Sequence, residues 1–462
     1  MAADVNGSGV LTRYLTLFSI CVASFLMPMS LSAVNVALPD IAEDLKIDAV
    51  YLSWIPTMNL LGGIAMQLPS GRIADLYGRK RIFILGLLLY FISSAVVVYI
   101  EEVEWLLTSR FFQGVAGAMV FSTGMAIVSQ VFSQHNRGSA LGFIATSVYL
   151  GFSCGPLIGG WLTELWGWKS VFLAPLPLVV LSIGLVTLYV REQVQTSAEK
   201  LDWIGGLLFI FASSVFFFGV TNLSELMGWG ALIIGALIFI LFVFQQERAP
   251  YPLIRFRRVI ENRLFIRSLQ AALFMYAALY PLQFILSLYL QYIQGLSPVD
   301  AGHLMLLQPA VMAVLAPLSG LLSDRYEPKK IATTGCLILA AGFLMLALLD
   351  QNSSIEYIGL GLVICGIGFG LFSTPNNNAA MGSIPIERLS IGSSMLSMAR
   401  TMGNMLGMTV VVLMFNQALG GEVITVESYA SLLWVLKYAF ILSFVCACLA
   451  AVFSFNRGNL RV

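Results

Sequence analysis

Long apolar runs follow one another along the whole chain and are separated by short polar segments. A helix needs about 20 apolar residues to cross the hydrocarbon core of a bilayer. Continuous runs argue against a β-barrel, whose strands would alternate apolar and polar residues over about ten positions. We predict an all-α multi-spanning membrane protein with fourteen helices. The predicted spans are 14–38, 50–69, 81–100, 104–130, 138–163, 170–190, 203–221, 229–245, 265–292, 299–322, 331–349, 355–375, 389–416 and 431–455.

The polar segments divide these spans into groups of six, two and six. A short polar loop follows residue 190, and the longest polar connection covers residues 246–263. The predicted domains are an N-terminal six-helix bundle (1–191), two inserted helices with a linker (192–263) and a C-terminal six-helix bundle (264–462).

Charge predicts the orientation of the spans. An inner N-terminus places 20 of the 25 Lys and Arg residues on the inner side, as the positive-inside rule requires. The first two outer loops are acidic, with Asp40, Glu43, Asp44, Asp48, Glu101, Glu102 and Glu104. We therefore expect a multi-pass protein of the inner (cytoplasmic) cell membrane with both termini in the cytoplasm. Twelve spans with a re-entrant pair is the alternative to fourteen.

Three short patterns occur twice, at separations that agree within three residues. The pairs are Gly71–Arg81 with Gly320–Lys330, Val120–Thr123 with Leu371–Thr374, and Gly155–Gly159 with Gly403–Gly407. The first pair places a Gly, an Asp four residues later and then basic residues between two apolar runs. A duplication of this kind is typical of transporters whose two halves rock against each other.

Composition agrees with a membrane protein and gives no sign of an enzyme. Hydrophobic residues make up 58% of the chain, charged residues 11%, and the mean hydropathy is +0.87, whereas about 25% of residues are charged in soluble proteins. The net charge of +1 gives no argument for nucleic acid binding. The six cysteines all lie in predicted spans, and only two histidines are present. No metal, nucleotide or nucleophile motif occurs.

Four motifs make the chain resemble the major facilitator superfamily and, within it, the fourteen-span drug:proton antiporter branch. They are Gly71–Arg81, Arg110-Phe-Phe-Gln113-Gly114, the segment from Gly151 to Gly160, and Val34-Asn35-Val36-Ala37-Leu38-Pro39. The resemblance implies the major facilitator fold, with two six-helix bundles plus two inserted helices. It also implies a monomer in the lipid bilayer that uses the proton gradient and no cofactor. Its partners would be a small-molecule substrate and protons.

The resemblance assigns gating to the duplicated loop. Asp75 can pair with Arg79 four residues on and can face the N-terminal end of another helix. In the family this charge cluster latches the two halves in the outward-open state, and Asp324 would form the mirror-related contact. The expected latch residues are Gly71, Asp75, Gly78, Arg79, Arg81, Gly320, Asp324 and Arg325. The alternative is an ordinary basic loop.

Glycines spaced four apart in the fifth span form a stripe along one helix face. Gly151, Gly155 and Gly159 would let a neighbouring helix approach closely, while Pro156 frees a backbone bond and bends the span. Gly160 continues the motif. In the resembling family this helix seals the substrate cavity and is typical of exporters. Plain helix packing is the alternative.

Charged groups inside predicted spans are few and are candidates for coupling or substrate binding. Arg110 and Gln113 lie nearly one turn apart, and Arg400 lies in the thirteenth span. No acid lies in the middle of a span, and Ser30 occupies the position where the resembling branch usually has an Asp. Dicationic substrates are therefore disfavoured. An arginine that only joins two helices is the alternative reading of Arg110 and of Arg400.

Proton coupling would then need peripheral groups. Asp300 and His303, three residues apart at the outer start of the tenth span, could form a titratable pair. The alternative is a helix cap with a histidine at the headgroup level.

A large, mostly apolar, amide-rich pocket is the expected substrate site. Its candidate lining residues are Ser30, Asn35, Trp54, Asn59, Tyr149, Gln283, Gln308, Asn376 and Asn404. We expect an exporter of hydrophobic or amphipathic small molecules. The alternatives are an exporter of an anionic or lipid-like metabolite and a non-transporting membrane receptor on the same fold.

Overall fold

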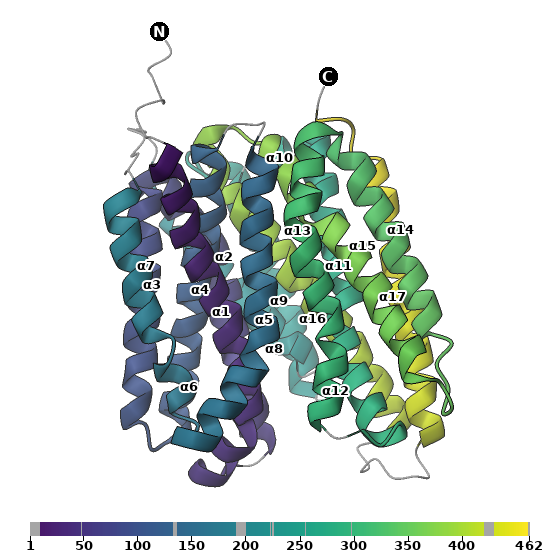
Figure 1. The fold of residues 1–462 in the computed structure, drawn as a ribbon. Helices are drawn as coiled ribbons and strands as arrows, with labels where there is room; N and C mark the ends of the chain where they lie inside the picture. The colour runs from purple at the N-terminus through teal and green to yellow at the C-terminus, as the bar shows by residue number, and fades with distance from the viewer. Residues whose placement is uncertain are drawn as a thin grey trace.

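The computed structural model describes residues 10–47, 49–132, 136–190, 200–221, 223, 226–254, 256–296, 298–419 and 429–460. Across these residues the chain is helical, and no strand occurs within them. Most helices stand side by side along one direction (Figure 1). Helix α1 begins and α17 ends at the same end of this array, called here the terminal end. The opposite end is called the far end.

Helices α1 to α7 form the N-terminal half. They are α1 (Val10–Leu45), α2 (Ala49–Tyr77), α3 (Arg79–Ala95), α4 (Val103–Val131), α5 (Arg137–Trp166), α6 (Ser170–Leu173) and α7 (Leu176–Tyr189). Helix α1 packs mainly on α5 and α7, and α4 packs on α2 and α3. The sixth predicted span is divided into α6 and α7, with Pro175 directly before α7 and Pro177 as the second residue of α7.

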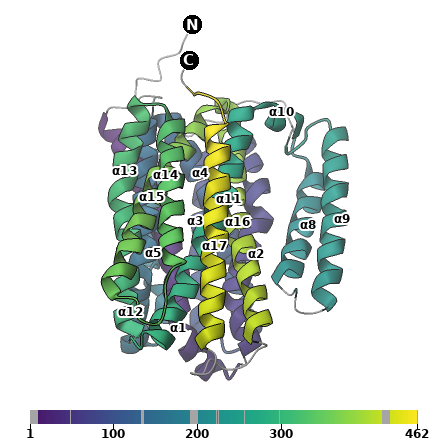
Figure 2. The same cartoon turned by 90° about the vertical axis from the view of Figure 1, so that its right-hand side faces the viewer.

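Helices α8 (Trp203–Thr221) and α9 (Leu226–Arg248) form a hairpin beside the main array (Figure 2). Within the described chain, α8 contacts α2 and α16, while the main partner of α9 is α8. Much of α9 is exposed, including Ile233, Leu237 and Leu241, as suits a helix that faces lipid. Helix α10 (Phe256–Glu261) follows at the terminal end.

The C-terminal half repeats the plan of the first. Its helices are α11 (Arg263–Leu288), α12 (Pro298–Met305), α13 (Leu307–Arg325), α14 (Pro328–Leu346), α15 (Ile355–Gly382), α16 (Leu389–Leu419) and α17 (Tyr429–Phe455). Helix α11 packs on α16 and α17, and α15 packs on α13 and α14. The tenth predicted span is divided into α12 and α13, and the end of the ninth is a π-helical turn from Tyr289 to Ile293.

Two helix pairs carry most of the interface between the halves. Helix α5 packs on α13, and α2 packs on α16. The two largest buried apolar clusters are centred on different halves, one around Phe83 and Leu87 and the other around Phe343 and Phe369. Both clusters extend across the interface, the first to Leu396 of α16 and the second to Tyr149 of α5.

Twelve helices of the described chain are long and apolar enough to cross a membrane, so the expected fourteen spans are not confirmed. Helices α2 and α16 are absent from these twelve, although they have 29 and 31 residues. The two helices face each other across the interface between the halves.

Candidate functional site

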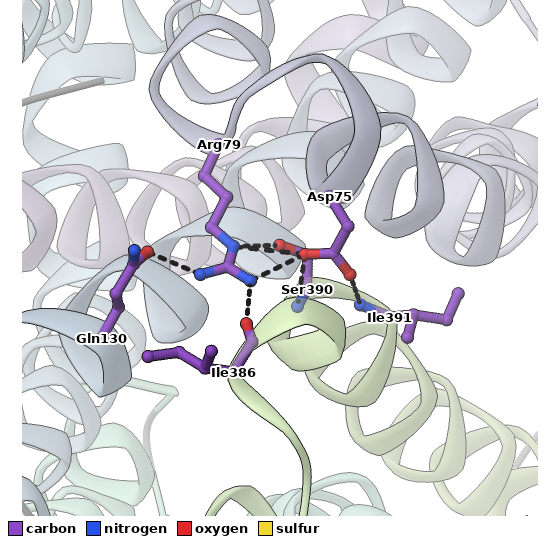
Figure 3. Close-up of polar contacts among 6 residues, drawn as sticks. All are labelled: Asp75, Arg79, Gln130, Ile386, Ser390 and Ile391. Carbon is purple, nitrogen blue, oxygen red and sulfur yellow. Dashed lines mark hydrogen bonds and ion pairs between the residues drawn. The ribbon is translucent and has the colours of Figure 1, made fainter. Parts of the chain in front are cut away.

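The first candidate site is a polar contact of Asp75, near the end of α2, with Ser390 and Ile391 at the start of α16 (Figure 3). The Asp75 carboxylate accepts hydrogen bonds from the backbone N–H groups of Ser390 (3.2 Å) and Ile391 (3.0 Å). These N–H groups belong to the first turn of α16, where backbone donors have no partner within their own helix. The carboxylate therefore caps a helix of the other half, where the helix dipole favours a negative charge.

Arg79 completes this contact. Its guanidinium forms an ion pair with Asp75 at 2.9 Å and donates to the carbonyl of Ile386 at 2.6 Å and to the Ser390 hydroxyl at 3.0 Å. It also donates to Gln130. The Asp75 side chain is 1% exposed and that of Arg79 9%, so the pair is shielded from water. Arg79 thus binds the same segment of the other half that Asp75 caps.

Small residues let the two chains approach at this contact. A Cβ atom on Gly71 would clash with Ser394 and with the Ser390 carbonyl in α16. Gly78, between α2 and α3, has a φ of 111°, a conformation that favours glycine. Arg81, by contrast, is exposed.

The second copy of the motif makes the mirror-related contact. Asp324, near the end of α13, accepts hydrogen bonds from the backbone N–H groups of Gly138 and Ser139, both at 2.8 Å. These residues form the first turn of α5 in the N-terminal half. A Cβ on Gly320 would clash with the Gly138 carbonyl, as at Gly71. Arg325 is exposed.

Three consecutive asparagines in α15 hold three arginines from different parts of the chain. Asn378 accepts from Arg137 of α5 at 3.0 Å, and its amide nitrogen donates to Ser323, next to Asp324. Asn377 accepts from Arg400 of α16 at 2.6 Å. Successive helix residues point about 100° apart, so each amide serves a different side of α15.

Asn376, the third of these residues, accepts from Arg457 at 2.9 Å and donates to the Ser268 carbonyl. Arg457 follows α17 and is fully buried, and this burial lowers the pKa of its guanidinium to about 10. Asn376 therefore fixes the C-terminal segment to α15 instead of lining a pocket with Arg400.

A buried polar chain runs through the N-terminal half toward the far end. Arg110 donates to Gln113 at 2.7 Å, and Gln113 donates to Ser94 at 3.0 Å. Arg110 also donates to the Ile55 carbonyl at 3.3 Å, and its guanidinium lies 5.9 Å from the Phe172 ring centroid. The expected proximity of Arg110 and Gln113 is thus observed. One guanidinium nitrogen, Nη2, has no hydrogen-bond partner.

Arg400 lies in a different setting, among aromatic rings. Its guanidinium is 5.6 Å from the Tyr276 ring centroid, and Tyr276 meets Phe369 edge-to-face at 5.1 Å. Tyr149, from the other half, meets the same Phe369 at 6.2 Å. The Nε atom of Arg400 and the Oδ1 atom of Asn404, one turn further along α16, are buried without hydrogen-bond partners. This cluster thus combines one guanidinium with three aromatic rings and two buried polar atoms without hydrogen-bond partners.

The glycine stripe of α5 packs against α1. Cβ atoms on Gly151, Gly155 or Gly159 would clash with the backbone or Cβ atoms of Phe25, Met29, Ser32 or Ala33 in α1. Gly160 faces only Val36 at 3.7 Å, an ordinary contact. Helix α5 runs without interruption from Arg137 to Trp166, and Pro156 is exposed.

Several candidate residues lie away from the aromatic cluster. Asn35 and Gln283 are exposed, and so are Asp300 and His303 in α12. Trp54 stacks on Phe218 of α8 at 5.4 Å, so it contacts the inserted hairpin. Asn59 donates to the Arg110 carbonyl and joins α2 to α4. Buried candidates with unpartnered atoms are Ser30 (Oγ) and Gln308 (Nε2).

Within the described chain, no group of three or more His, Cys, Asp or Glu side chains could hold a metal ion.

A family profile described as Major Facilitator Superfamily matches residues 20–408, which is most of the chain. The chain belongs to the major facilitator superfamily.

Curated relatives within the superfamily include transporters of different molecules. The chain is 30% identical to the riboflavin transporter RibZ of Clostridioides difficile (strain 630) over 412 residues, covering 88% of this chain and 89% of RibZ. It is 30% identical to the multidrug resistance protein Stp of Mycobacterium tuberculosis (strain CDC 1551 / Oshkosh), covering 86% and 75%. Among solved structures, the proton:xylose symporter XylE has a TM-score of 0.70 at 12% identity, covering 96% and 95%.

These findings establish several sequence-based predictions. The protein is a multi-pass membrane protein of the major facilitator fold and a secondary transporter of small molecules, not an enzyme. Transporters of this superfamily need no cofactor and use an ion gradient. The antiporter branch, the proton as coupling ion and the roles of single residues stay predictions.

Sequence reasoning missed the partners of the two aspartates. Ser390, Ile391, Gly138 and Ser139 are not among the residues predicted from the sequence, and neither is Arg137. The repeat itself held a signal for them. If the carboxylate of the N-terminal half caps a helix of the C-terminal half, the duplication predicts that the carboxylate of the C-terminal half caps the equivalent helix of the N-terminal half.

Proposed function

We propose that this protein exports hydrophobic or amphipathic small molecules by alternating access and proton antiport. The reciprocal pair of caps supports this proposal most strongly. Asp75 reaches from the N-terminal half to α16, and Asp324 reaches from the C-terminal half to α5. Both contacts lie at the terminal end, so breaking them frees the two halves to separate there. A receptor that does not move has no use for two such releasable contacts.

Export agrees with the orientation proposed from charge, in which the terminal end is cytoplasmic and the membrane is the inner one. When both helix caps are formed, the two halves are in contact at the cytoplasmic end, which corresponds to an outward-facing state. We also propose that α2 and α16 cross the membrane, which gives the fourteen spans of the antiporter branch. Their lengths of 29 and 31 residues exceed the roughly 20 that a span requires. The division into 1–191, 192–263 and 264–462 follows from this topology, although residues 191–199 lie outside the described chain.

Transport by proteoliposomes tests this function. Purified protein is reconstituted with an acidic lumen, and uptake of riboflavin and of a neutral lipophilic dye is followed by fluorescence. We expect uptake that requires the protein and disappears when nigericin collapses the pH gradient. Uptake that persists without the gradient would refute proton coupling, and the absence of any protein-dependent uptake across a wide panel would favour the receptor alternative.

A second candidate, export of an anionic molecule, is favoured by Arg400. Its Nε atom is buried without a hydrogen-bond partner beside the rings of Tyr276, Phe369 and Tyr149. A carboxylate on a flat ring system would pair with this nitrogen, because charge-assisted hydrogen bonds are stronger than neutral ones. Competition by 2-naphthoate and by 2-naphthamide distinguishes the candidates. Stronger inhibition by the acid, lost in Arg400→Gln, supports an anionic substrate, and equal inhibition contradicts it.

A further inference from the structure

The guanidinium of Arg110 is a buried positive charge without a visible counter-charge. The side chain is 1% exposed, and its hydrogen bonds go to a neutral amide and a backbone carbonyl. Within the part of the chain that the structure describes, no Asp or Glu interacts electrostatically with the Arg110 guanidinium. A charge removed from water is costly unless an opposite charge or a full set of hydrogen bonds compensates it. Here the Nη2 atom lacks even a hydrogen bond.

Two buried hydroxyl groups near Arg110 lack a well-aligned hydrogen-bond partner. Ser30 of α1 is 2% exposed and Tyr90 of α3 is 3% exposed, and neither side-chain oxygen has a partner in good hydrogen-bond geometry. Ser30 and Ser94 lie close enough to the Tyr90 hydroxyl for weak hydrogen bonds, and the charge of Arg110 also acts on this hydroxyl. Ser94 lies one turn after Tyr90 in α3 and accepts from Gln113, which in turn accepts from Arg110. Three unpartnered buried groups from α1, α3 and α4 therefore lie in one region.

We propose that Arg110, Ser30 and Tyr90 bind a small monovalent anion such as chloride, which serves as a fixed counter-ion inside the N-terminal half. The three groups offer one N–H and two O–H donors. A halide accepts several hydrogen bonds at once, brings none of its own donors that would need partners, and supplies the missing negative charge. A cation is excluded by Arg110.

The test distinguishes chloride from two other occupants of the site, a water molecule and an anionic group of a transported molecule. A water molecule would complete hydrogen bonds but would leave the guanidinium uncompensated. An anionic group of a transported molecule would supply the charge only while substrate is bound. Binding of a free halide differs from both because it stabilises the protein in the absence of any substrate.

The measurement is thermal unfolding of purified protein in detergent, followed by tryptophan fluorescence, with sodium chloride replaced stepwise by sodium gluconate at constant ionic strength. A ligand that binds only the folded state raises the unfolding midpoint with concentration. We expect chloride and bromide to raise the midpoint of wild type by about 2 °C or more, whereas gluconate is too large to enter.

Three variants locate the effect. Ser30→Asp places a carboxylate where the anion would lie, and Arg110→Gln removes the charge that requires it; both should abolish the chloride response. Tyr90→Phe removes one donor and should weaken the apparent chloride affinity by about tenfold. Arg400→Gln is the matched control, because it removes the other intramembrane arginine and should retain the chloride response.

Each alternative result overturns the proposal. Equal midpoints in chloride and gluconate for wild type would mean that the site holds water or stays without an ion. A chloride response that survives in both Ser30→Asp and Arg110→Gln would place the anion elsewhere. If only an anionic substrate stabilises wild type, and Ser30→Asp loses that effect, the site belongs to the substrate. None of these readings depends on whether proton-coupled export is observed.

Discussion

At the Asp75 contact the arginine belongs to the same half as the carboxylate, whereas at the Asp324 contact it belongs to the helix that the carboxylate caps. Arg79 is the first residue of α3, and Pro328 is the first residue of α14. Conversely, Arg137 begins α5, and Leu389 begins α16. Arg137 lies close enough to Asp324 for their charges to interact, while it donates to Asn378.

The different origin of the arginine at the two contacts shows which parts of the contact the two halves share. Both keep a glycine that admits the other chain and a carboxylate that caps a helix N-terminus. The arginine that balances the carboxylate occurs on either side of the interface. The shared element is therefore the capped helix, and the position of the positive charge is free to change.

The largest effect is expected from Asp75→Asn. The variant leaves Arg79 partly buried without its ion-pair partner, and breaking such a pair costs about 3 kcal/mol. We expect transport in proteoliposomes to fall at least tenfold and the thermal midpoint to decrease. Glu104→Gln, at the far end, is the control. Full transport by Asp75→Asn would show that the carboxylate does not hold a gate.

Asp324→Asn should have a smaller effect, of a few-fold on transport. Its neighbour Arg137 keeps a hydrogen bond to Asn378 when the carboxylate is lost, whereas Asp75→Asn removes the ion pair of Arg79. The two variants are measured side by side in the same vesicles. Equal losses would mean that the side of the interface that provides the arginine has no energetic consequence.

Moving the arginine tests the comparison directly. Arg79→Gln should reduce transport, and adding Leu389→Arg should recover part of the loss, because the new guanidinium occupies the position that Arg137 has in the other half. A double-mutant cycle measures the coupling between the two positions. If the transport losses of the two single variants simply add in the double variant, an arginine at position 389 does not replace Arg79.

The smallest effects are expected at the exposed basic residues. Arg81 and Arg325 occur in the two copies of the motif, but both side chains are exposed. Exposed charges contribute little because solvent screens them. Arg81→Gln and Arg325→Gln should each leave transport within about twofold of wild type. A loss comparable to that of Asp75→Asn would mean that net loop charge, and not the cap, closes the terminal end.

The sequence predicted the helices and the duplicated motif well because both are local or periodic signals. It did not predict that α2 continues to Tyr77, so Asp75 was placed in a loop although its side chain is 1% exposed. It also could not assign helix faces. Trp54 was expected at a cavity, but the inserted hairpin covers that face of α2 through Phe218. Contacts such as Arg137 with Asn378 join residues 241 positions apart, which no local pattern reveals.

The three asparagines of α15 have a consequence for the helix register. If α15 slipped by one residue, each arginine would meet the neighbour of its present partner. Slippage in one direction presents Ala379 to Arg137, and slippage in the other presents Pro375 to Arg457. Arg400 meets an asparagine in both cases, because its partner Asn377 is the middle of the three. A run of identical amides therefore protects the contact at the centre of the C-terminal half against a register error, and any loss falls on its two outer neighbours.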